Sequence, residues 1–244
     1  MHIIKLDAIG STNTFLKDYV SNGGVENYTV VTAEEQTHGR GQVGAKWYSE
    51  PGKNLMFSVF CGFQKFKFVD YTYLNYTVSL AVFEVLKRYG LSKLKIKWPN
   101  DIMAGNRKIG GILIENVLNK EEIKHSIIGV GLNVNQSKFS EEFGKASSLK
   151  KKLGKNIDRT VLLNDLIVSI KSHIEFCVPE NFEAIKASYL QALYKKEIPT
   201  MFKDSEDAVF IGKIKNVSNL GKLQVELEDE SIKEFEIKEI QLIN

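Results

Sequence analysis

The chain has 244 residues, which is long for one domain but too short for two large ones. Its content of 43% hydrophobic and 26% charged residues is that of a globular protein with a substantial core, and a net charge of +3 is too small to indicate a dedicated nucleic-acid binder. Cys61 and Cys177 form no CxxC or Cys/His pattern, and no signal peptide or long apolar run is visible, which favours a cytoplasmic protein without disulfides, structural zinc or a membrane span.

The first predicted elements are a strand over residues 2–9 and a helix over residues 14–20, whose apolar residues share one face. Ser11, Thr12 and Asn13 lie between them. One small polar residue at this place usually caps the helix, whereas three exceed what a cap needs. The three side chains therefore either serve the helix alone or offer spare hydroxyl and amide groups to a ligand.

A long connection follows, from a strand that ends near residue 34 to a strand over residues 54–60. It contains one arginine between two glycines at residues 39–41, and then Lys46 and Trp47. Glycine lets the backbone approach a ligand closely, and arginine presents a planar fork that suits phosphate or carboxylate. We interpret this segment as an anion-binding loop in which residues 37–46 close over the ligand; the alternative is an ordinary surface loop.

The letters GRGQVG at residues 39–44 also match the dinucleotide fingerprint GxGxxG. That fingerprint requires a helix to begin at the glycines, so that the helix N-terminus meets the pyrophosphate. Here the glycines are followed by the turn-rich AKWYSEPGKN and another strand. We therefore predict that the match is accidental.

The middle of the chain places polar residues at the ends and gaps of strands. A helix is predicted over residues 71–89 and a strand over residues 94–97, which runs into WPND at 98–101. Residues 102–106 are predicted to turn the chain back into a strand over 107–116, and a further strand covers 121–133. Glycine pairs interrupt both of these strands, at 110–111 and at 129 and 131, and indicate bulges or a close approach to a ligand.

The last third changes character near residue 197. Helices are predicted over residues 139–143, 159–176 and 182–194, and short strands over 208–217, 222–227 and 231–237. The lysine-rich stretch at 150–155 is interpreted as solvated surface. We expect two domains, residues 1–195 and residues 196–244, with the second a small all-β module.

Five segments together resemble one family. They are GSTN at 10–13, EEQTHGRGQVGAKWYSEPGKNL at 34–55, KIKWPNDIM at 95–103, RKIGGILIE at 107–115 and GVGLNV at 129–134. In order and spacing they are similar to the catalytic domain of biotin–protein ligases, over roughly residues 7–135. The resemblance implies an α+β fold, with a class II synthetase-like mixed sheet, helices packed on it, and an SH3-like β-barrel at the C-terminus.

The resemblance also implies a reaction. Biotin and ATP, with Mg²⁺, would form biotinyl-AMP and pyrophosphate, and a lysine of a biotin carboxyl carrier domain would then take the biotin. The implied catalytic residues are Arg40, Lys97, Asp101 and Lys108. The implied biotin-binding residues are Ser11, Thr12, Asn13, Gln36, Gly39, Arg40, Gly41, Gln42, Lys108, Gly111 and Ile112. The implied ATP-binding residues are Arg40, Trp47, Asn54, Asn100, Lys108 and Asn133.

Several alternatives stay open at this point. Asp101 either acts on the acceptor lysine or helps to hold Mg²⁺, and Trp47 either packs under the closed loop or is a core residue. Gln42 stands where the family commonly has a basic residue, which keeps open a sensor that binds biotin or adenylate without transferring it. A lipoate or octanoate transferase is a third reading, although the related lipoate ligases lack the KWPND segment. Because the first strand begins at His2, we expect no DNA-binding module; a homodimer through an exposed sheet edge stays open.

Overall fold

A seven-stranded mixed sheet forms the larger part of the protein. The computed structural model describes residues 2–140 and 145–243. The strands run in the order β1-β2-β3-β7-β6-β5-β4, and only β1 and β2 are paired in parallel. Their bounds are β1 (Ile3–Ile9), β2 (Val30–Gln36), β3 (Leu55–Lys67), β4 (Leu94–Lys97), β5 (Asp101–Ala104), β6 (Arg107–Asn119) and β7 (Glu122–Leu132).

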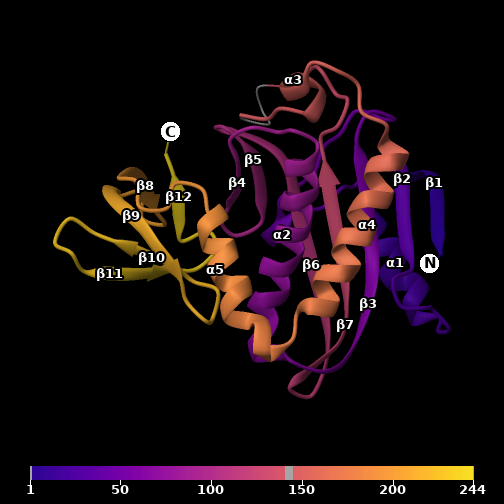
Figure 1. Cartoon of the computed structure of the whole chain (residues 1–244), viewed down its shortest axis with the longest axis horizontal. Coiled ribbons are helices and arrows are strands. Elements are labelled where there is room, and N and C mark those ends of the chain that lie inside the picture. The colour runs from indigo at the N-terminus through magenta and orange to yellow at the C-terminus, as the bar shows by residue number, and fades with distance from the viewer. Residues whose placement is uncertain (1, 141–144, 244) are drawn as a thin grey trace.

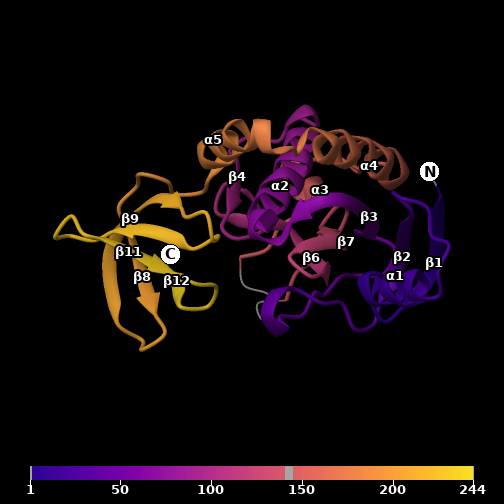
Figure 2. The ribbon, with the colours of Figure 1, turned by 90° about the horizontal axis from the view of Figure 1, so that it is seen from below.

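Helices cover the two faces of this sheet unequally. Figure 2 shows α2 (Tyr71–Arg88), α4 (Arg159–Phe176) and α5 (Phe182–Ala192) along one face, whereas α1 (Thr12–Ser21) lies on the other. α2 carries the apolar stripe that the sequence predicts, and Leu74, Val78 and Val82 are fully buried there. The opposite face is left to α1 and to the connection between β2 and β3.

A five-stranded antiparallel sheet follows, in the order β11-β10-β9-β8-β12. Its strands are β8 (Thr200–Asp204), β9 (Val209–Val217), β10 (Leu223–Glu226), β11 (Ile232–Phe235) and β12 (Ile240–Leu242). Figure 1 shows it beside α5 and β4. The turn between β9 and β10 attaches it to the turn after β4 and to the start of α2, because the Trp98 indole donates a hydrogen bond to the Gly221 carbonyl at 3.0 Å and the Tyr71 hydroxyl donates to the Leu220 carbonyl at 3.0 Å.

The predicted α+β class and the all-β character of the C-terminal part are confirmed. α4 has the predicted bounds, while α1 begins two residues before the predicted start. The prediction of a turn over residues 102–106 is wrong, since β5 occupies Asp101–Ala104. Ile102, Met103 and Ala104 are all buried, so this short strand lacks the alternating pattern that identifies a strand. β8, β12 and the short helix α3 (Leu149–Leu153) were not predicted.

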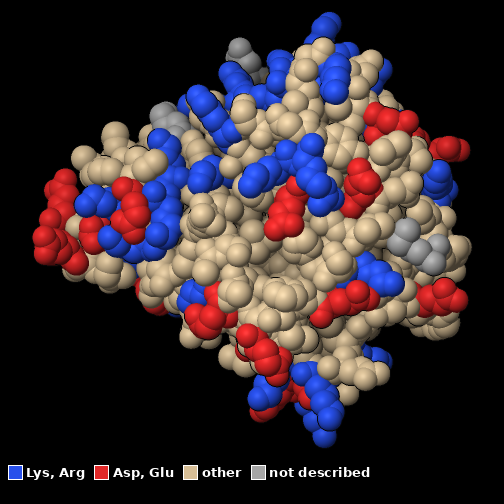
Figure 3. Space-filling model, viewed as in Figure 1, with Lys and Arg blue, Asp and Glu red and all other residues tan. Residues whose placement is uncertain are grey.

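Two further expectations concern the surface and the segment before α3. Residues 141–143 of the helix predicted over 139–143 lie outside the described residues, and residues 139 and 140 are not helical. Lys151, Lys152 and Lys155 are exposed, as predicted, and lysines and arginines gather along the edge of the molecule near α3 in Figure 3. None of the helices in the described part of the chain combines the length and the apolar character that crossing a bilayer requires.

Candidate functional site

A cavity of about 260 Å³ lies between the β2–β3 connection and strands β3, β6 and β7. We call this connection, residues 37–54, the glycine loop. Most of the residues singled out from the sequence line the cavity: Ser11, Thr12, Asn13, Gln36, Arg40, Gly41, Gln42, Trp47, Asn100, Asp101, Lys108, Gly111 and Ile112. Met56, Phe57, Leu113 and Val130 add an apolar wall. The motifs at five separate places in the chain are therefore brought together at one site.

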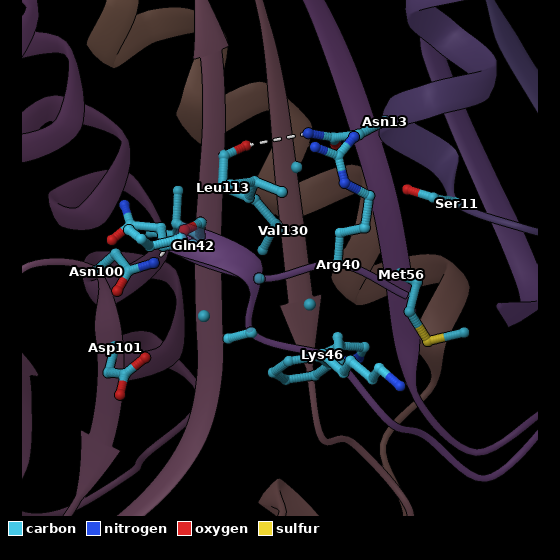
Figure 4. Close-up of a pocket in the computed structure, with 18 of the residues that line it drawn as sticks. Ser11, Asn13, Arg40, Gln42, Lys46, Met56, Asn100, Asp101, Leu113 and Val130 are labelled. Atoms are coloured by element: carbon cyan, nitrogen blue, oxygen red, sulfur yellow. Dashed lines mark hydrogen bonds between the residues drawn. The ribbon is translucent and has the colours of Figure 1, made fainter. Parts of the chain in front are cut away.

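One end of the cavity, the polar end, is a network of hydroxyl and amide groups around the start of α1, bordered by the Arg40–Glu115 ion pair. The Gln36 side-chain oxygen accepts hydrogen bonds from the Thr12 backbone N–H at 2.8 Å and from the Thr12 hydroxyl at 3.0 Å. Ser11, at the N-cap position, makes no capping hydrogen bond with its side chain. The reading in which the three polar residues serve only as a helix cap is therefore wrong, because Gln36 caps the helix from β2. Figure 4 shows the Ser11 hydroxyl directed toward the cavity.

Asn13 is held in a single orientation at this end. Its carbonyl oxygen accepts from the Ser58 hydroxyl at 2.6 Å, and its amide nitrogen donates to a Glu115 carboxylate oxygen at 2.8 Å. A longer contact of 3.4 Å reaches the Leu113 carbonyl (Figure 4). Gly129 of β7 makes room for this side chain, since a Cβ atom at residue 129 would collide with the Asn13 side-chain oxygen. Asn13 is 3% exposed, so the network is formed before any ligand arrives.

The other end, the charged end, contains the ion pair of Lys108 and Asp101, at 2.5 Å. The Lys108 side chain is 40% exposed and that of Asp101 is 22% exposed. Asp101 begins β5 and is paired with Gly111 of β6, which leaves space beside the Lys108 ammonium. A lysine ammonium in such a position offers donors to an anion at the mouth of the cavity.

Trp47 of the glycine loop lies across β7 at this end. A Cβ atom at residue 131 would come within 2.7 Å of the indole ring, so the ring packs against the backbone of Gly131. The Lys108 ammonium lies 5.8 Å from the ring centroid, a cation–π distance. Within the described part of the chain, the indole N–H of Trp47 and the side-chain oxygen of Gln42 are buried without hydrogen-bond partners. Trp47 therefore packs under the loop and is not a core residue.

Arg40 lies at the polar end, away from Lys108. Its guanidinium donates to a Glu115 carboxylate oxygen at 3.0 Å and to the Thr14 hydroxyl at 3.4 Å. Figure 4 shows Arg40 beside Asn13, with Asp101 and Asn100 at the opposite side of the cavity. The glycines around it lead into a short 3-10 turn at Gln42–Gly44 and then into β3. No α-helix begins at the glycines, so the GxGxxG match is accidental, as predicted.

Four predicted site residues are outside the lining of this cavity, as far as the described residues show. Gly39 is buried and lines a neighbouring cavity along the glycine loop, and its carbonyl accepts from the Trp47 N–H at 2.9 Å. Lys97 lines a smaller adjoining cavity of about 200 Å³. Asn54, just before β3, accepts from the Val134 N–H at 3.0 Å, and Asn133, just after β7, donates to the Ser147 carbonyl at 3.0 Å, so both side chains tie together segments at the ends of these strands.

Three polar contributors to the site were not predicted from the sequence. Glu115 follows Gly111 and Leu113 by alternation along β6, so strand periodicity places it on the cavity face and could have identified it. Ser58 lies in a buried apolar strand and gives no signal. Lys238, together with Ile237, reaches the cavity from the turn after β11, and only the packing of the two sheets brings it there.

Comparison with known proteins gives consistent matches. A model of the biotin/lipoate A/B protein ligase family matches residues 6–133. The chain is 29% identical over 245 residues to the bifunctional ligase/repressor BirA of Bacillus subtilis, covering 99% of this chain and 74% of that protein. It is 31% identical over 131 residues to biotin–[acetyl-CoA-carboxylase] ligase of Mycobacterium tuberculosis, covering 52% of this chain and 47% of that one.

Solved structures show the same likeness over the whole chain. The biotin protein ligase from Aquifex aeolicus in complex with biotin and ATP is 27% identical, with a TM-score of 0.80, and the match covers 99% of this chain and 98% of that one. The Leishmania major biotin protein ligase in complex with biotinyl-5-AMP is 23% identical, with a TM-score of 0.60 and coverage of 97% and 99%. At that identity the second likeness shows the fold alone.

Proposed function

The chain belongs to the biotin/lipoate A/B protein ligase family as a biotin–protein ligase, and we propose that it joins biotin to a lysine of a carrier domain in two steps. In the first, an oxygen of the biotin carboxylate attacks the α-phosphorus of ATP, biotinyl-AMP forms and pyrophosphate leaves. In the second, the neutral lysine amine attacks the acyl carbon, the C–O bond breaks and AMP leaves. The observation that carries this proposal is that a single cavity joins a network of hydroxyl and amide groups to an end that carries the Lys108 ammonium.

The polar end suits the ureido ring of biotin. That ring is neutral and carries one carbonyl acceptor and two N–H donors, so it requires neutral partners of both kinds. The Ser11 hydroxyl, the Thr12 hydroxyl and the amides of Asn13 and Gln36 are of this kind, and all four residues line the cavity. Met56, Phe57 and Val130 would contact the apolar part of the ligand.

The charged end suits the reaction at phosphorus. A carboxylate and a triphosphate repel each other, and fixed cations lower that repulsion most where water is excluded. Lys108 supplies one such cation at the charged end, and Arg40, which also lines the cavity, supplies the other from the polar end. The buried Trp47 N–H and Gln42 oxygen would find partners on the nucleotide. The protein needs to position and stabilise charge, and no covalent intermediate on the enzyme is required.

The residues present fit Mg²⁺ in only one arrangement. The described residues contain no group of three His, Cys, Asp or Glu side chains that could hold a metal ion. Mg²⁺ commonly binds through one or two carboxylates together with substrate phosphates, and Asp101 is the carboxylate in the cavity lining. Bound there, the ion would neutralise phosphate charge. After pyrophosphate has left, the Asp101 carboxylate is free to orient the ammonium of the acceptor lysine and to accept its proton.

The remaining parts of the proposal concern organisation. We place the domain boundary between residues 195 and 196, and we assign the C-terminal module, which contributes Ile237 and Lys238 to the cavity, a part in receiving the carrier domain. Both cysteines are free and buried, which suits a cytoplasmic protein. A homodimer through an edge strand of the larger sheet, β1 or β4, stays a prediction.

The test is mass spectrometry of a biotin carboxyl carrier domain incubated with this protein, ATP, Mg²⁺ and biotin. We expect the carrier to gain one biotin, and to gain nothing without ATP or when lipoate replaces biotin. Pyrophosphate release without modification of the carrier would reduce the function to adenylation alone. Modification by lipoate would move the assignment to the other branch of the family.

A further inference from the structure

Glu115 connects the two most distinctive parts of the site. It lies on β6, and its two carboxylate oxygens have different partners: one accepts from the Asn13 amide at 2.8 Å and the other pairs with Arg40 at 3.0 Å. We propose that Glu115 is a positioning residue that couples the biotin end of the cavity to the arginine of the glycine loop. This inference rests on the ligase function proposed above and assigns to Glu115 a part that the sequence motifs did not.

The contact with Asn13 fixes which way its amide points. A side-chain amide has a donor end and an acceptor end, and exchanging them would reverse what the residue offers to biotin. A carboxylate can only accept, so Glu115 requires the NH₂ group of Asn13 on its own side. Without Glu115, the partner of this NH₂ group would be the Leu113 carbonyl at 3.4 Å, a weak hydrogen bond.

The contact with Arg40 fixes the loop. The Arg40 side chain is 49% exposed and that of Glu115 is 23% exposed, so this ion pair contributes little to stability. Its effect is on position, because it holds the guanidinium above the polar end of the cavity. A guanidinium has five N–H donors, and the contacts to Glu115 and Thr14 leave donors for a ligand phosphate.

Coupling follows because one carboxylate serves both partners. Biotin bound against Asn13 favours the Glu115 position that also holds Arg40, and an Arg40 fixed over the adenylate favours the same position in return. Such coupling between two ligand positions is reciprocal. We therefore expect the loss of Glu115 to act differently on biotin binding and on adenylate retention, according to which contact the substitution removes.

Two substitutions separate the contacts. Glu115→Gln keeps an oxygen that can accept from Asn13 but removes the charge that pairs with Arg40, whereas Glu115→Ala removes both. We expect Glu115→Gln to leave the KM for biotin within ~3-fold of the unmodified protein and to raise the rate of adenylate escape ~10-fold, as a neutral partner replaces a charged one. Glu115→Ala should raise the rate of adenylate escape and should also raise the KM for biotin, by at least ~10-fold. Thr14→Ala, which removes the longer Arg40 contact, is the matched control and should behave as the unmodified protein.

A cycle with Arg40 tests the coupling itself. In an Arg40→Ala background, Glu115→Gln should add nothing further to adenylate escape, while Glu115→Ala should still weaken biotin binding. If the two Glu115 variants changed both quantities in the same proportion, or if the effects of Arg40→Ala and Glu115→Gln were additive, the positioning role would be wrong. A purely structural role would lower the melting temperature without separating KM from adenylate escape.

A final readout does not depend on catalysis. Trypsin cleaves after Arg40, and we expect cleavage at this site in the ligand-free protein to be faster in both Glu115 variants and unchanged in Thr14→Ala. Biotin binding by calorimetry gives the second quantity. If the unmodified protein released no pyrophosphate from biotin and ATP, the proposed function would fail, while cleavage and calorimetry would still decide the positioning role. Equal cleavage rates in all the proteins would overturn it.

Discussion

The two ends of the cavity differ in whether their polar groups already have hydrogen-bond partners in the protein. At the polar end, Thr12, Asn13 and Ser58 are buried, and each has a hydrogen-bond partner in the protein. At the charged end, Lys108 is 40% exposed, and the buried N–H of Trp47 and oxygen of Gln42 have no partner within the described residues. Thr12, Asn13 and Ser58 lie on a helix and a strand, whereas Lys108 lies on a strand and Trp47 and Gln42 lie on the glycine loop.

This difference separates recognition from chemistry. A neutral group such as the ureido ring must be selected by directed hydrogen bonds, and directed hydrogen bonds require groups that are already fixed. A triphosphate brings its own charge, so cations can be recruited as the loop closes, and unsatisfied groups find their partners then. We expect substitutions at the polar end to act on biotin affinity and substitutions at the charged end to act on the nucleotide and on the rate.

The largest effect should come from Lys108→Ala at the charged end. Removing one fixed charge-stabilising donor from an active site typically lowers the rate about 10²–10³-fold. We expect a loss of this size in pyrophosphate release, with biotin affinity nearly unchanged and the protein folded, because Lys108 is 40% exposed. Lys124→Ala, which removes an exposed lysine of β7, is the control. Full activity of Lys108→Ala would show that Lys108 is not the cation that stabilises charge during the reaction at phosphorus.

Gly129→Ala should act at the polar end alone. Its methyl group would collide with the oxygen of Asn13, which is held by Ser58 and Glu115 and cannot move freely. Overpacking of this kind costs about 1–3 kcal/mol, and if Asn13 is displaced we expect biotin affinity to fall roughly 10–100-fold. Calorimetric titration with biotin measures it. An unchanged affinity would mean that Asn13 does not contact biotin.

Gly131→Ala is the matched substitution two residues along the same strand. Its methyl group would meet the indole of Trp47, which belongs to the glycine loop and can shift. We expect nucleotide affinity to fall only about 3–10-fold, with biotin affinity unchanged, since the ring belongs to a loop and can move away from the added methyl group. Titration with nucleotide in the presence of biotin measures the nucleotide affinity. A larger effect on biotin than on nucleotide would contradict the division into two ends.

The sequence predicted the parts of the fold that repeat a pattern. α2 and α4 carry apolar stripes over several turns, and both were found at nearly their observed bounds. β5 has four residues, three of them buried and apolar, and no alternation, so periodicity could not identify it. β12 has three residues and depends on pairing with β8 for its existence, which no local pattern reports.

The motifs predicted which residue types gather at the site, but they did not predict which of these residues contact one another. Glycine inside a strand predicted a bulge or a close approach to a ligand at Gly129 and Gly131, and the structure shows close approaches by protein side chains at both residues. The sequence could not say what approaches, since Asn13 and Trp47 come from distant parts of the chain and the sheet order decides their positions. The pairing of Arg40 with Glu115 was hidden for the same reason. Residue types and local spacing reveal the ligand chemistry, whereas the couplings between groups require the fold.

The smallest effect concerns His125, on the same strand as Gly129 but outside the cavity lining. Burial, assisted by the charge of Lys124, lowers the pKa of His125 below its ordinary value of 6.5. The unfolded chain therefore binds a proton more readily, so this contribution to stability is present above about pH 6.5 and is lost as the pH falls through that value. Because the ring is partly solvated, the difference should stay below about 1 kcal/mol.

Urea unfolding near pH 7.5 and near pH 5 measures this difference. Between the two pH values, the free energy of unfolding should fall more in the unmodified protein than in His125→Gln. At neutral pH the two proteins should bind biotin equally well. A change in biotin affinity on this substitution would show that the polar end extends along β7 beyond Gly129, and the comparison between the ends would have to be redrawn around the whole strand.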